Sequence, residues 1–151
     1  MAVKVGDKIP EFTAIDTNGQ RFESNSIVGH KAVVIYFYPK DNTPGCTAQA
    51  CSFRDQYQDF TDLGAEVIGI SSDSQKSHEK FSKQYKLPFT LLSDNDKKIR
   101  NMFGVPTGLL GLLPGRVTYV ADKNGVVKMI FDSMMATKHI PKALEAIKKL
   151  V

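Results

Sequence analysis

Two cysteines, Cys46 and Cys51, are the residues of this chain best suited to covalent chemistry. The chain has no other cysteine, and its N-terminus lacks the apolar core of a secretory signal. In a reducing compartment disulfides are rarely structural, so two thiols there are more often catalytic or redox-active. The alternative is a pair of unrelated thiols, one packed in the core as a small apolar residue and one on the surface.

Cys46 is expected in the first turn of a helix, where an anionic sulfur is stabilised. Thr43 is a favoured N-cap residue, and Pro44 suits the first helical position. First-turn N–H groups have no helical partner, and the helix dipole adds positive potential. Both effects favour the thiolate, which is the nucleophilic form of cysteine. A helix terminus contributes at most about 2 kcal/mol, so strong activation requires a second positive charge.

Arg116 is our candidate for that second charge. It opens a predicted strand directly after Pro114-Gly115, and parallel-sheet folds gather their strand ends around one site. A guanidinium there would pair with the thiolate and would hold the oxygens of a substrate with its fixed fork of donors. The residues alone leave open the alternative, a surface arginine at the start of a strand.

Thr43 and Pro39 stand close to the expected nucleophile, and each has two compatible interpretations. Thr43 is either a plain N-cap or an N-cap whose hydroxyl also bonds the sulfur or the substrate. Pro39, like Pro44, is either a turn residue or a group that shapes the site without competing donors and limits access of water.

Cys51 cannot bridge to Cys46 while the expected helix is intact. Five residues along an ideal helix separate the Cα atoms by about 8.5 Å, whereas a disulfide needs less than about 7 Å. If the two thiols react, the first helical turns must unwind, and Gly45 would ease that change because glycine is a poor helix former. This spacing predicts a switch between a folded reduced form and a locally unfolded oxidised form.

A metal site is not favoured by the sequence. The cysteine spacing is not C-x-x-C, and the histidines are scattered singly along the chain. We interpret all three as surface or helix-end residues: His30, His78 and His139.

The leucines of the segment 109–113 have two interpretations. One is ordinary packing under a loop. The other is an apolar patch near the cysteines that receives a substrate or a partner protein. They are too few to span a bilayer, and no other stretch of the chain is apolar over the roughly 18 residues that spanning requires.

The elements that must position these residues alternate between strand and helix patterns. The run 32–38 is apolar, β-branched and aromatic, which is typical of a central strand buried on both faces. A helix is predicted over 44–63, because apolar residues recur there at spacings of three and four. The other predicted strands are 12–16, 20–22, 66–71, 90–93, 116–122 and 126–131, and the other predicted helices are 77–85, 97–103 and 139–151.

This order predicts one thioredoxin-like α/β domain over residues 1–151. We expect a central mixed sheet with helices on both faces and an N-terminal β-hairpin at Asn18-Gly19. The formal net charge is +4, and basic and acidic residues are interleaved, so nucleic-acid binding is not favoured.

At these residues the chain resembles a peroxiredoxin, and most of all the subfamily called bacterioferritin comigratory protein or peroxiredoxin Q. The first matching piece, FYPKDNTPGCTAQACSFRD, contains the family's Pro-x-x-x-Thr-x-x-Cys pattern as Pro39, Thr43 and Cys46. The others are VIGISSDS followed by HEKF, LPFTLLSD, and GLLPGRVTYVADKNGVV, so the resemblance covers nearly the whole chain. The stretch 108–115 looks most like cyanobacterial and chloroplast members.

The resemblance implies Cys46 as the peroxidatic nucleophile, Cys51 as the resolving cysteine and Arg116 as the active-site arginine. Gln49 is a departure, because many relatives carry Glu there. An amide still hydrogen-bonds, but a negative charge near the site is lost.

The implied cycle is that of an atypical 2-Cys peroxidase, an antioxidant enzyme without a bound cofactor. Cys46 attacks hydrogen peroxide or an organic hydroperoxide and becomes a sulfenic acid, and Cys51 condenses with it to an intramolecular disulfide. A thioredoxin-type partner then reduces the disulfide. The resemblance also implies a monomer. From the composition and the N-terminus we expect no membrane or nucleic-acid partner and a bacterial cytoplasmic location, or a chloroplast location if a transit peptide has been removed.

Two other functions stay open on the residues alone. A general thiol–disulfide oxidoreductase on the same fold would normally carry C-x-x-C, and here Cys46 is followed by TAQA. A redox-sensing binding protein is the other, although no specific binding surface is evident in the sequence.

Overall fold

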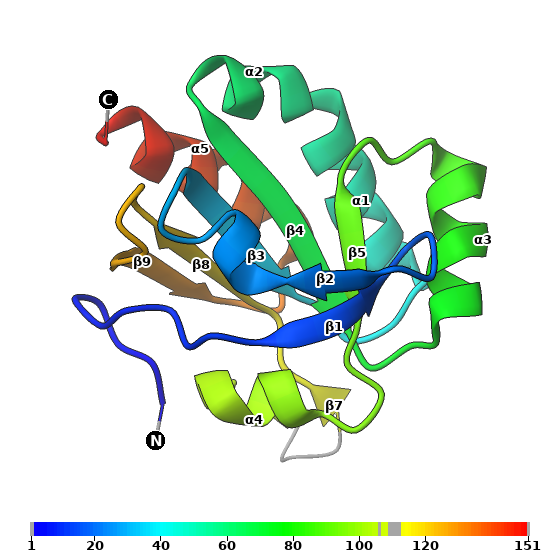
Figure 1. Cartoon of the computed structure of the whole chain (residues 1–151). Helices are drawn as coiled ribbons and strands as arrows, with labels where there is room; N and C mark the ends of the chain where they lie inside the picture. Colours follow the sequence, from blue (N-terminus) through cyan, green and yellow to red (C-terminus); the bar gives the residue numbers. More distant parts are fainter. Residues whose placement is uncertain (1, 106, 109–112, 151) are drawn as a thin grey trace.

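Strands and helices alternate along the computed structural model of the chain, which describes residues 2–105, 107–108 and 113–150. Seven strands form one mixed sheet in the order β2-β1-β5-β4-β3-β8-β9 (Figure 1). They are β1 Thr13–Asp16, β2 Arg21–Glu23, β3 Ala32–Phe37, β4 Ala65–Ser71, β5 Thr90–Ser93, β8 Val117–Ala121 and β9 Val127–Asp132. Two further strands, β6 Thr107–Gly108 and β7 Leu113–Pro114, form a separate two-stranded ribbon.

Helices cover both faces of this sheet, which confirms the predicted thioredoxin-like α/β fold with its N-terminal hairpin. The helices are α1 Pro44–Asp55, α2 Tyr57–Asp62, α3 Gln75–Tyr85, α4 Lys98–Phe103 and α5 His139–Lys148, with short 3-10 helices η1 Ser24–Ser26 and η3 Ala136–Lys138. Strands β1 and β2 pair antiparallel, and Gly19 adopts a φ of 80° in their turn, a conformation that glycine reaches without strain.

The sheet topology brings the start of α1 next to the start of β8. Strands β3, β4 and β5 run parallel, with α1 and α2 crossing from β3 to β4 and α3 crossing from β4 to β5. The carboxyl ends of β3 and β4 therefore lie at one edge, where α1 and α3 begin. Because β8 is antiparallel to β3, Val117 pairs with Phe37, the last residue of β3. Arg116 consequently lies beside the chain that leads into α1.

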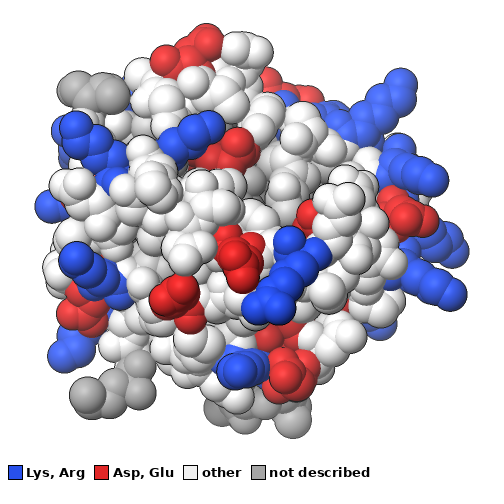
Figure 2. Space-filling view, viewed as in Figure 1, with Lys and Arg blue, Asp and Glu red and all other residues white. Residues whose placement is uncertain are grey.

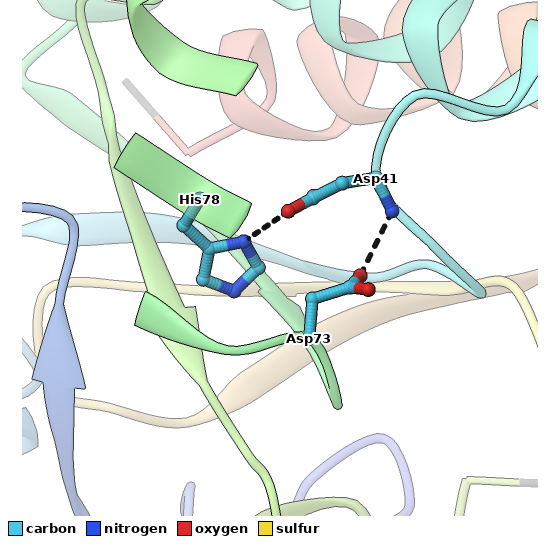
Figure 3. Close-up of side chains that lie close together, drawn as sticks. All are labelled: Asp41, Asp73 and His78. Carbon is cyan, nitrogen blue, oxygen red and sulfur yellow. Dashed lines mark hydrogen bonds and ion pairs between the residues drawn. The ribbon is translucent and has the colours of Figure 1, made fainter. Parts of the chain in front are cut away.

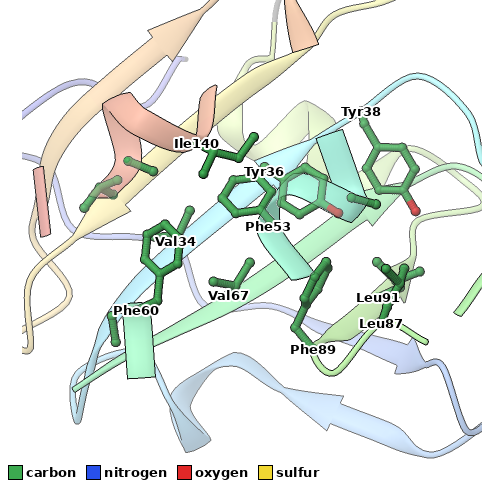
Figure 4. Packing of buried hydrophobic residues seen from close by; sticks show 14 of the residues in the cluster. Val34, Tyr36, Tyr38, Phe53, Phe60, Val67, Leu87, Phe89, Leu91 and Ile140 are labelled. Atoms are coloured by element: carbon green, nitrogen blue, oxygen red, sulfur yellow. The ribbon is translucent and has the colours of Figure 1, made fainter. Parts of the chain in front are cut away.

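Strand β3 divides the interior into two cores, as expected for a strand buried on both faces. Val34 and Tyr36 point to the core beneath α1, α2, α3 and α5, whereas Ile35 and Phe37 point to the core beneath α4 and the N-terminal segment. In the first core the ring of Tyr36 stacks on that of Phe53 from α1, with centroids 4.7 Å apart (Figure 4). This contact holds the C-terminal end of α1 against the sheet.

The predicted single helix over 44–63 is wrong in one respect, because the structure divides it at Gln56. The ψ angle of Gln56 is 9°, far from the helical value, so the chain changes direction between α1 and α2. Phe53 and Phe60, on either side of the break, still pack in the same core. Apolar periodicity does not detect a break that leaves the buried face continuous.

The interpretation of the histidines as surface or helix-end residues is confirmed for His30, which is exposed, and is wrong for His78. The side chain of His78 is completely buried within the first turns of α3. His139 does begin α5, as a helix-end residue, but it is also buried. Both rings are hydrogen-bonded on both nitrogens, which is the condition under which a polar ring tolerates burial.

The surface agrees with the interleaved charges of the sequence. Basic and acidic side chains are interspersed on the face shown in Figure 2. Among the described residues, no helix is both long and apolar enough to cross a bilayer. The leucine segment 109–113, for which two interpretations were given, lies outside the described residues except for the backbone of Leu113 in β7.

Candidate active site

Cys46 lies in the first turn of α1, as predicted, and only 1% of its surface is exposed. Thr43 is the N-cap, with extended φ and ψ of −86° and 152°, and Pro44 occupies the first helical position. The carbonyl of Thr43 accepts the first helical hydrogen bond from the N–H of Thr47, at 2.8 Å. The sulfur is therefore held where unpaired backbone N–H groups and the helix dipole favour an anion.

The hydroxyl of Thr43 does not cap the helix. It donates to the carbonyl of Lys40 at 3.0 Å, and no side-chain cap bond is formed. The first turn of α1 thus lacks a stabilising contact that typically contributes about 1 kcal/mol. With its proton directed at Lys40, the Thr43 oxygen keeps lone pairs that can accept a hydrogen bond.

Arg116 contacts the sulfur directly, so the interpretation as a plain surface arginine is wrong. Its Nη2 donates to Sγ of Cys46 at 3.2 Å, and only 4% of the residue is exposed. Gly45 makes room for this approach, because a Cβ at that position would lie 3.3 Å from Nη2. Guanidinium and sulfur meet away from water, where their attraction is stronger than at the surface.

Gln49 completes the group around Cys46. It is fully buried one turn along α1, and its Oε1 accepts a hydrogen bond from Nη1 of Arg116. Among the described residues no carboxylate forms a salt bridge with Arg116, so its positive charge acts on the sulfur without local neutralisation. In the sequence, Gln49 was noted only because many proteins of the resembling family carry Glu at this position. Its contact with Arg116 joins residues 67 positions apart, so no local pattern could predict it.

Two buried donors beside the sulfur have no partner: Nε of Arg116 and Nε2 of Gln49. A buried unsatisfied donor costs about 1–3 kcal/mol, which folded proteins tolerate mainly at functional sites. Together with the contact from Nη2, they make the surroundings of Cys46 rich in hydrogen-bond donors. Such a site suits a small ligand that carries acceptor oxygens.

Arg100 supports the site through hydrogen bonds to the backbone, and no sequence pattern predicted this role. It is 5% exposed, and its guanidinium donates to the carbonyls of Gly115 at 3.2 Å and Tyr38 at 3.3 Å. Gly115 precedes Arg116, and Tyr38 precedes Pro39. One buried cation therefore fixes the two chain segments that carry the expected site residues. Burial lowers the pKa of Arg100, which nonetheless stays protonated at neutral pH.

Cys51 is not brought to Cys46. Both thiols are free and lie on the same uninterrupted helix α1, and Cys51 is half-buried. The structure therefore has the reduced, helical arrangement that the spacing predicts, in which the two sulfurs cannot bond. Pro39, half-buried, lies in the segment between β3 and α1.

A second polar cluster involves Asp41, which lies in the same segment between β3 and α1. No sequence pattern predicted this cluster. Figure 3 shows Asp41 facing His78, with Asp73 contacting the backbone of Asp41. Nδ1 of His78 and Oδ2 of Asp41 are 2.6 Å apart. Two ligands of one tetrahedral zinc ion lie about 3.3 Å apart, given bonds of about 2.0–2.1 Å. The pair is thus spaced for a hydrogen bond, and both atoms cannot ligate the same ion without moving apart.

Known proteins share this sequence and this fold. A family model described as AhpC/TSA matches residues 5–130. The chloroplastic peroxiredoxin Q of Sedum lineare is 52% identical over 149 residues, which cover 98% of this chain and 80% of that protein. The crystal structure of peroxidoxin BcpB from Mycobacterium tuberculosis superposes with a TM-score of 0.90 at 34% identity, covering 98% of each chain. Bacterioferritin comigratory protein of Xanthomonas campestris gives a TM-score of 0.83 at 30% identity, covering 91% of this chain and 90% of its own.

Proposed function

The chain belongs to the AhpC/TSA family as a peroxiredoxin of the Q type, a thiol-dependent peroxidase, and from this premise we propose that Cys46 is its peroxidatic nucleophile. The observation that carries the proposal is the 3.2 Å contact between Nη2 of Arg116 and Sγ of Cys46 at the N-terminus of α1. In our proposal Thr43 and Pro39 shape the opening to this sulfur.

The first step forms a bond between sulfur and oxygen. The thiolate of Cys46 attacks the terminal oxygen of the hydroperoxide, the O–O bond breaks, and the leaving alkoxide or hydroxide takes up a proton. Cys46 is left as a sulfenic acid. Negative charge moves from sulfur to oxygen in this step, and the donors of Arg116 stabilise it throughout. The lone pairs of Thr43 Oγ1 are suited to accept a hydrogen bond from the hydroxyl of the peroxide and so to orient it.

The second step joins the two cysteines of one chain. The first turns of α1 unwind, the thiol of Cys51 displaces water from the sulfenic acid, and a disulfide forms. A dithiol of the thioredoxin type then reduces this disulfide by exchange and supplies both electrons. Because the resolving thiol is in the same chain, we propose that residues 1–151 act as a single-domain monomer.

Substrate range and compartment are part of the proposal. The Xanthomonas relative is described by its alkyl peroxide reduction activity, which supports organic hydroperoxides as substrates beside hydrogen peroxide. We propose a reducing compartment, because the proposed cycle needs a thioredoxin-type dithiol to convert the disulfide back to two thiols. The chloroplastic relatives favour the chloroplast over the bacterial cytoplasm.

The assignment of the two cysteines is tested by exchanging each for serine. Cys46→Ser is expected to lose peroxide consumption with thioredoxin and its reductase, because a hydroxyl is not ionised at neutral pH. Cys51→Ser is expected to consume one peroxide per chain and then to stop. Insulin reduction by the wild type, measured in parallel, separates a peroxidase from a general thiol–disulfide oxidoreductase. Turnover by Cys46→Ser would reject the proposed nucleophile, and continued cycling by Cys51→Ser would reject the resolving thiol.

A further inference from the structure

The chain between β3 and α1 is fixed by a buried network that does not touch Cys46. The carboxylate of Asp41 is 2% exposed and accepts hydrogen bonds from Tyr38 Oη at 2.6 Å and Ser77 Oγ at 2.8 Å. Its Oδ2 is also 2.6 Å from Nδ1 of His78, which is fully buried (Figure 3). Asp41 thus has three side-chain partners, and two of them, Ser77 and His78, come from α3.

His78 is oriented by its other nitrogen. Nε2 lies 3.0 Å from the carbonyl of Leu92, which can only accept, so Nε2 carries a hydrogen. The backbone of Asp41 is held as well, because its N–H donates to Oδ2 of Asp73 at 2.8 Å. That carboxylate also accepts from Ser71 Oγ at 2.7 Å. Side chain and backbone of one residue are therefore both bound to the edge of β4 and the start of α3.

The position of Asp41 in the chain makes this network relevant to the helix. Asp41 lies three residues before Pro44, where α1 begins, and Asn42 between them has a φ of 60°. Asparagine is one of the few non-glycine residues that adopt this left-handed conformation readily, so Asn42 allows the chain to turn between Asp41 and α1. The partners of Asp41 outside its own segment belong to α3 and to the loop between β4 and α3, and none belongs to α1. Unwinding of α1 can therefore leave the network intact.

We propose that Asp41, held by His78 and Asp73, is the fixed point of the conformational cycle: it positions Thr43 and the first turn of α1 for the reaction with peroxide, and it sets the limit at which unwinding stops. Asp41 is a positioning residue in this account, because it does not touch the sulfur. The inference rests on the proposed function of Cys46 and Cys51.

The test separates the two chemical steps. Reduced protein is mixed rapidly with hydrogen peroxide, and sulfenic acid and disulfide are followed by mass spectrometry after quenching with an alkylating reagent. Asp41→Ala is expected to slow oxidation of Cys46 by about 10- to 100-fold, because a displacement of about 1 Å can cost that much. Disulfide formation from the sulfenic acid is expected not to slow, since it requires the unwound helix.

Asp41→Asn is the conservative variant, and the hydrogen-bond inventory predicts that it restores function. An amide Oδ1 can accept from Tyr38, and the two hydrogens of Nδ2 can reach Ser77 Oγ and an unprotonated Nδ1 of His78. We expect its oxidation rate to lie within about threefold of the wild type, because the network persists. If Asp41→Asn were as slow as Asp41→Ala, anchoring by hydrogen bonds would be the wrong explanation.

A matched pair of tyrosine variants keeps the test decisive if Asp41→Ala does not fold. Tyr38→Phe removes the hydroxyl that donates to Asp41, whereas Tyr57→Phe removes a similar hydroxyl that donates to Glu66 at 2.7 Å, at the opposite end of β4. Only Tyr38→Phe is expected to slow oxidation selectively, by a few fold. Equal rates in the two variants, or equal slowing of both chemical steps, would overturn the anchor. Absence of any reaction in the wild type would instead overturn the proposed function.

Discussion

The two cysteines stand on one helix, yet their surroundings differ in almost every physical respect. Cys46 is buried and contacts the guanidinium of Arg116. Cys51 is half-buried, and the nearby Arg54 is directed elsewhere, since it donates to Asp55 and to the carbonyl of Tyr85. A nucleophile needs a fixed environment that stabilises its anion, whereas a resolving thiol only has to be reached. The contrast is what a division of roles between the two thiols requires.

The two ends of α1 differ in the same way. The last turn of the helix is held by Phe53 stacked on Tyr36, but the first turn contains Gly45 and has no side-chain cap. Local unfolding is drawn from the least stable part of a structure. We therefore expect unwinding to begin at the first turn and to end before Phe53, with Asp41 fixed on the other side.

The largest effect is expected from removing the charge beside Cys46. Arg116→Met should lower the rate of Cys46 oxidation by hydrogen peroxide about 10²- to 10³-fold, the usual loss for one donor that stabilises developing charge. Rapid-mixing kinetics with reduced protein measure this rate. Arg54→Met, which removes the arginine near Cys51, is the control and should change the rate less than about threefold, since Arg54 does not contact the reacting sulfur. Similar losses in both variants would show that the contrast between the two environments is not functional.

An intermediate effect is expected from changing the ease of unwinding. Ala48→Gly, at an exposed position of α1, should speed disulfide formation about fivefold, because glycine costs the helix about 1 kcal/mol relative to alanine. Gly45→Ala should slow the same step by a similar factor and should also weaken the contact with Arg116, whose Nη2 would lie 3.3 Å from the new Cβ. The rate of disulfide formation after one peroxide addition measures both. Identical rates in the two variants would indicate that helix unwinding does not limit the step.

The smallest effect is expected from protonation of His139, whose neutral ring supports the backbone of Arg116 through Ser133. Nε2 of His139 donates to the carbonyl of Ser133 at 2.6 Å, and the N–H of Ser133 donates to the carbonyl of Arg116 at 3.2 Å. Burial lowers the pKa of His139 below its usual value near 6.5. The neutral ring is therefore the form that the folded state prefers. The stabilisation by the neutral ring of His139 is complete above about pH 6.5, the pKa in the unfolded chain. It is lost as the pH falls through the lowered pKa that His139 has in the folded protein.

We accordingly expect the free energy of unfolding to fall between pH 7 and about pH 5, and to fall less in His139→Gln, which cannot take up a proton. Urea denaturation at several pH values measures this difference. Parallel curves for the wild type and His139→Gln would contradict the assignment.

The sequence predicted those features that have a local cause. The start of α1 after Thr43, the first-turn position of Cys46 and the incompatibility of a helical Cys46–Cys51 pair with a disulfide all follow from a few consecutive residues. The side-chain cap expected of Thr43 is not formed, because its hydroxyl donates to Lys40 instead. The fold class was predictable because alternating strand and helix patterns extend over many residues. Arg116 could be predicted as a site residue because the strand ends of such folds converge on one site.

The remaining parts of the site depend on contacts between distant residues. Asp41 and His78 are 37 positions apart, and Arg100 reaches the carbonyl of Tyr38 across 62 positions. Nothing next to these residues distinguishes them from surface charges, so His78 was taken for a surface or helix-end histidine. The break at Gln56 was missed for a related reason, since both helices bury the same face.

The most direct measurement is the mass of the whole protein after addition of one equivalent of hydrogen peroxide, with and without alkylation of free thiols. The account predicts the loss of two hydrogens, no alkylated cysteine, and one disulfide that joins the peptides of Cys46 and Cys51 within a single chain. A Cys46 that stays reduced and alkylatable in peroxide, or a disulfide between two chains, would contradict it.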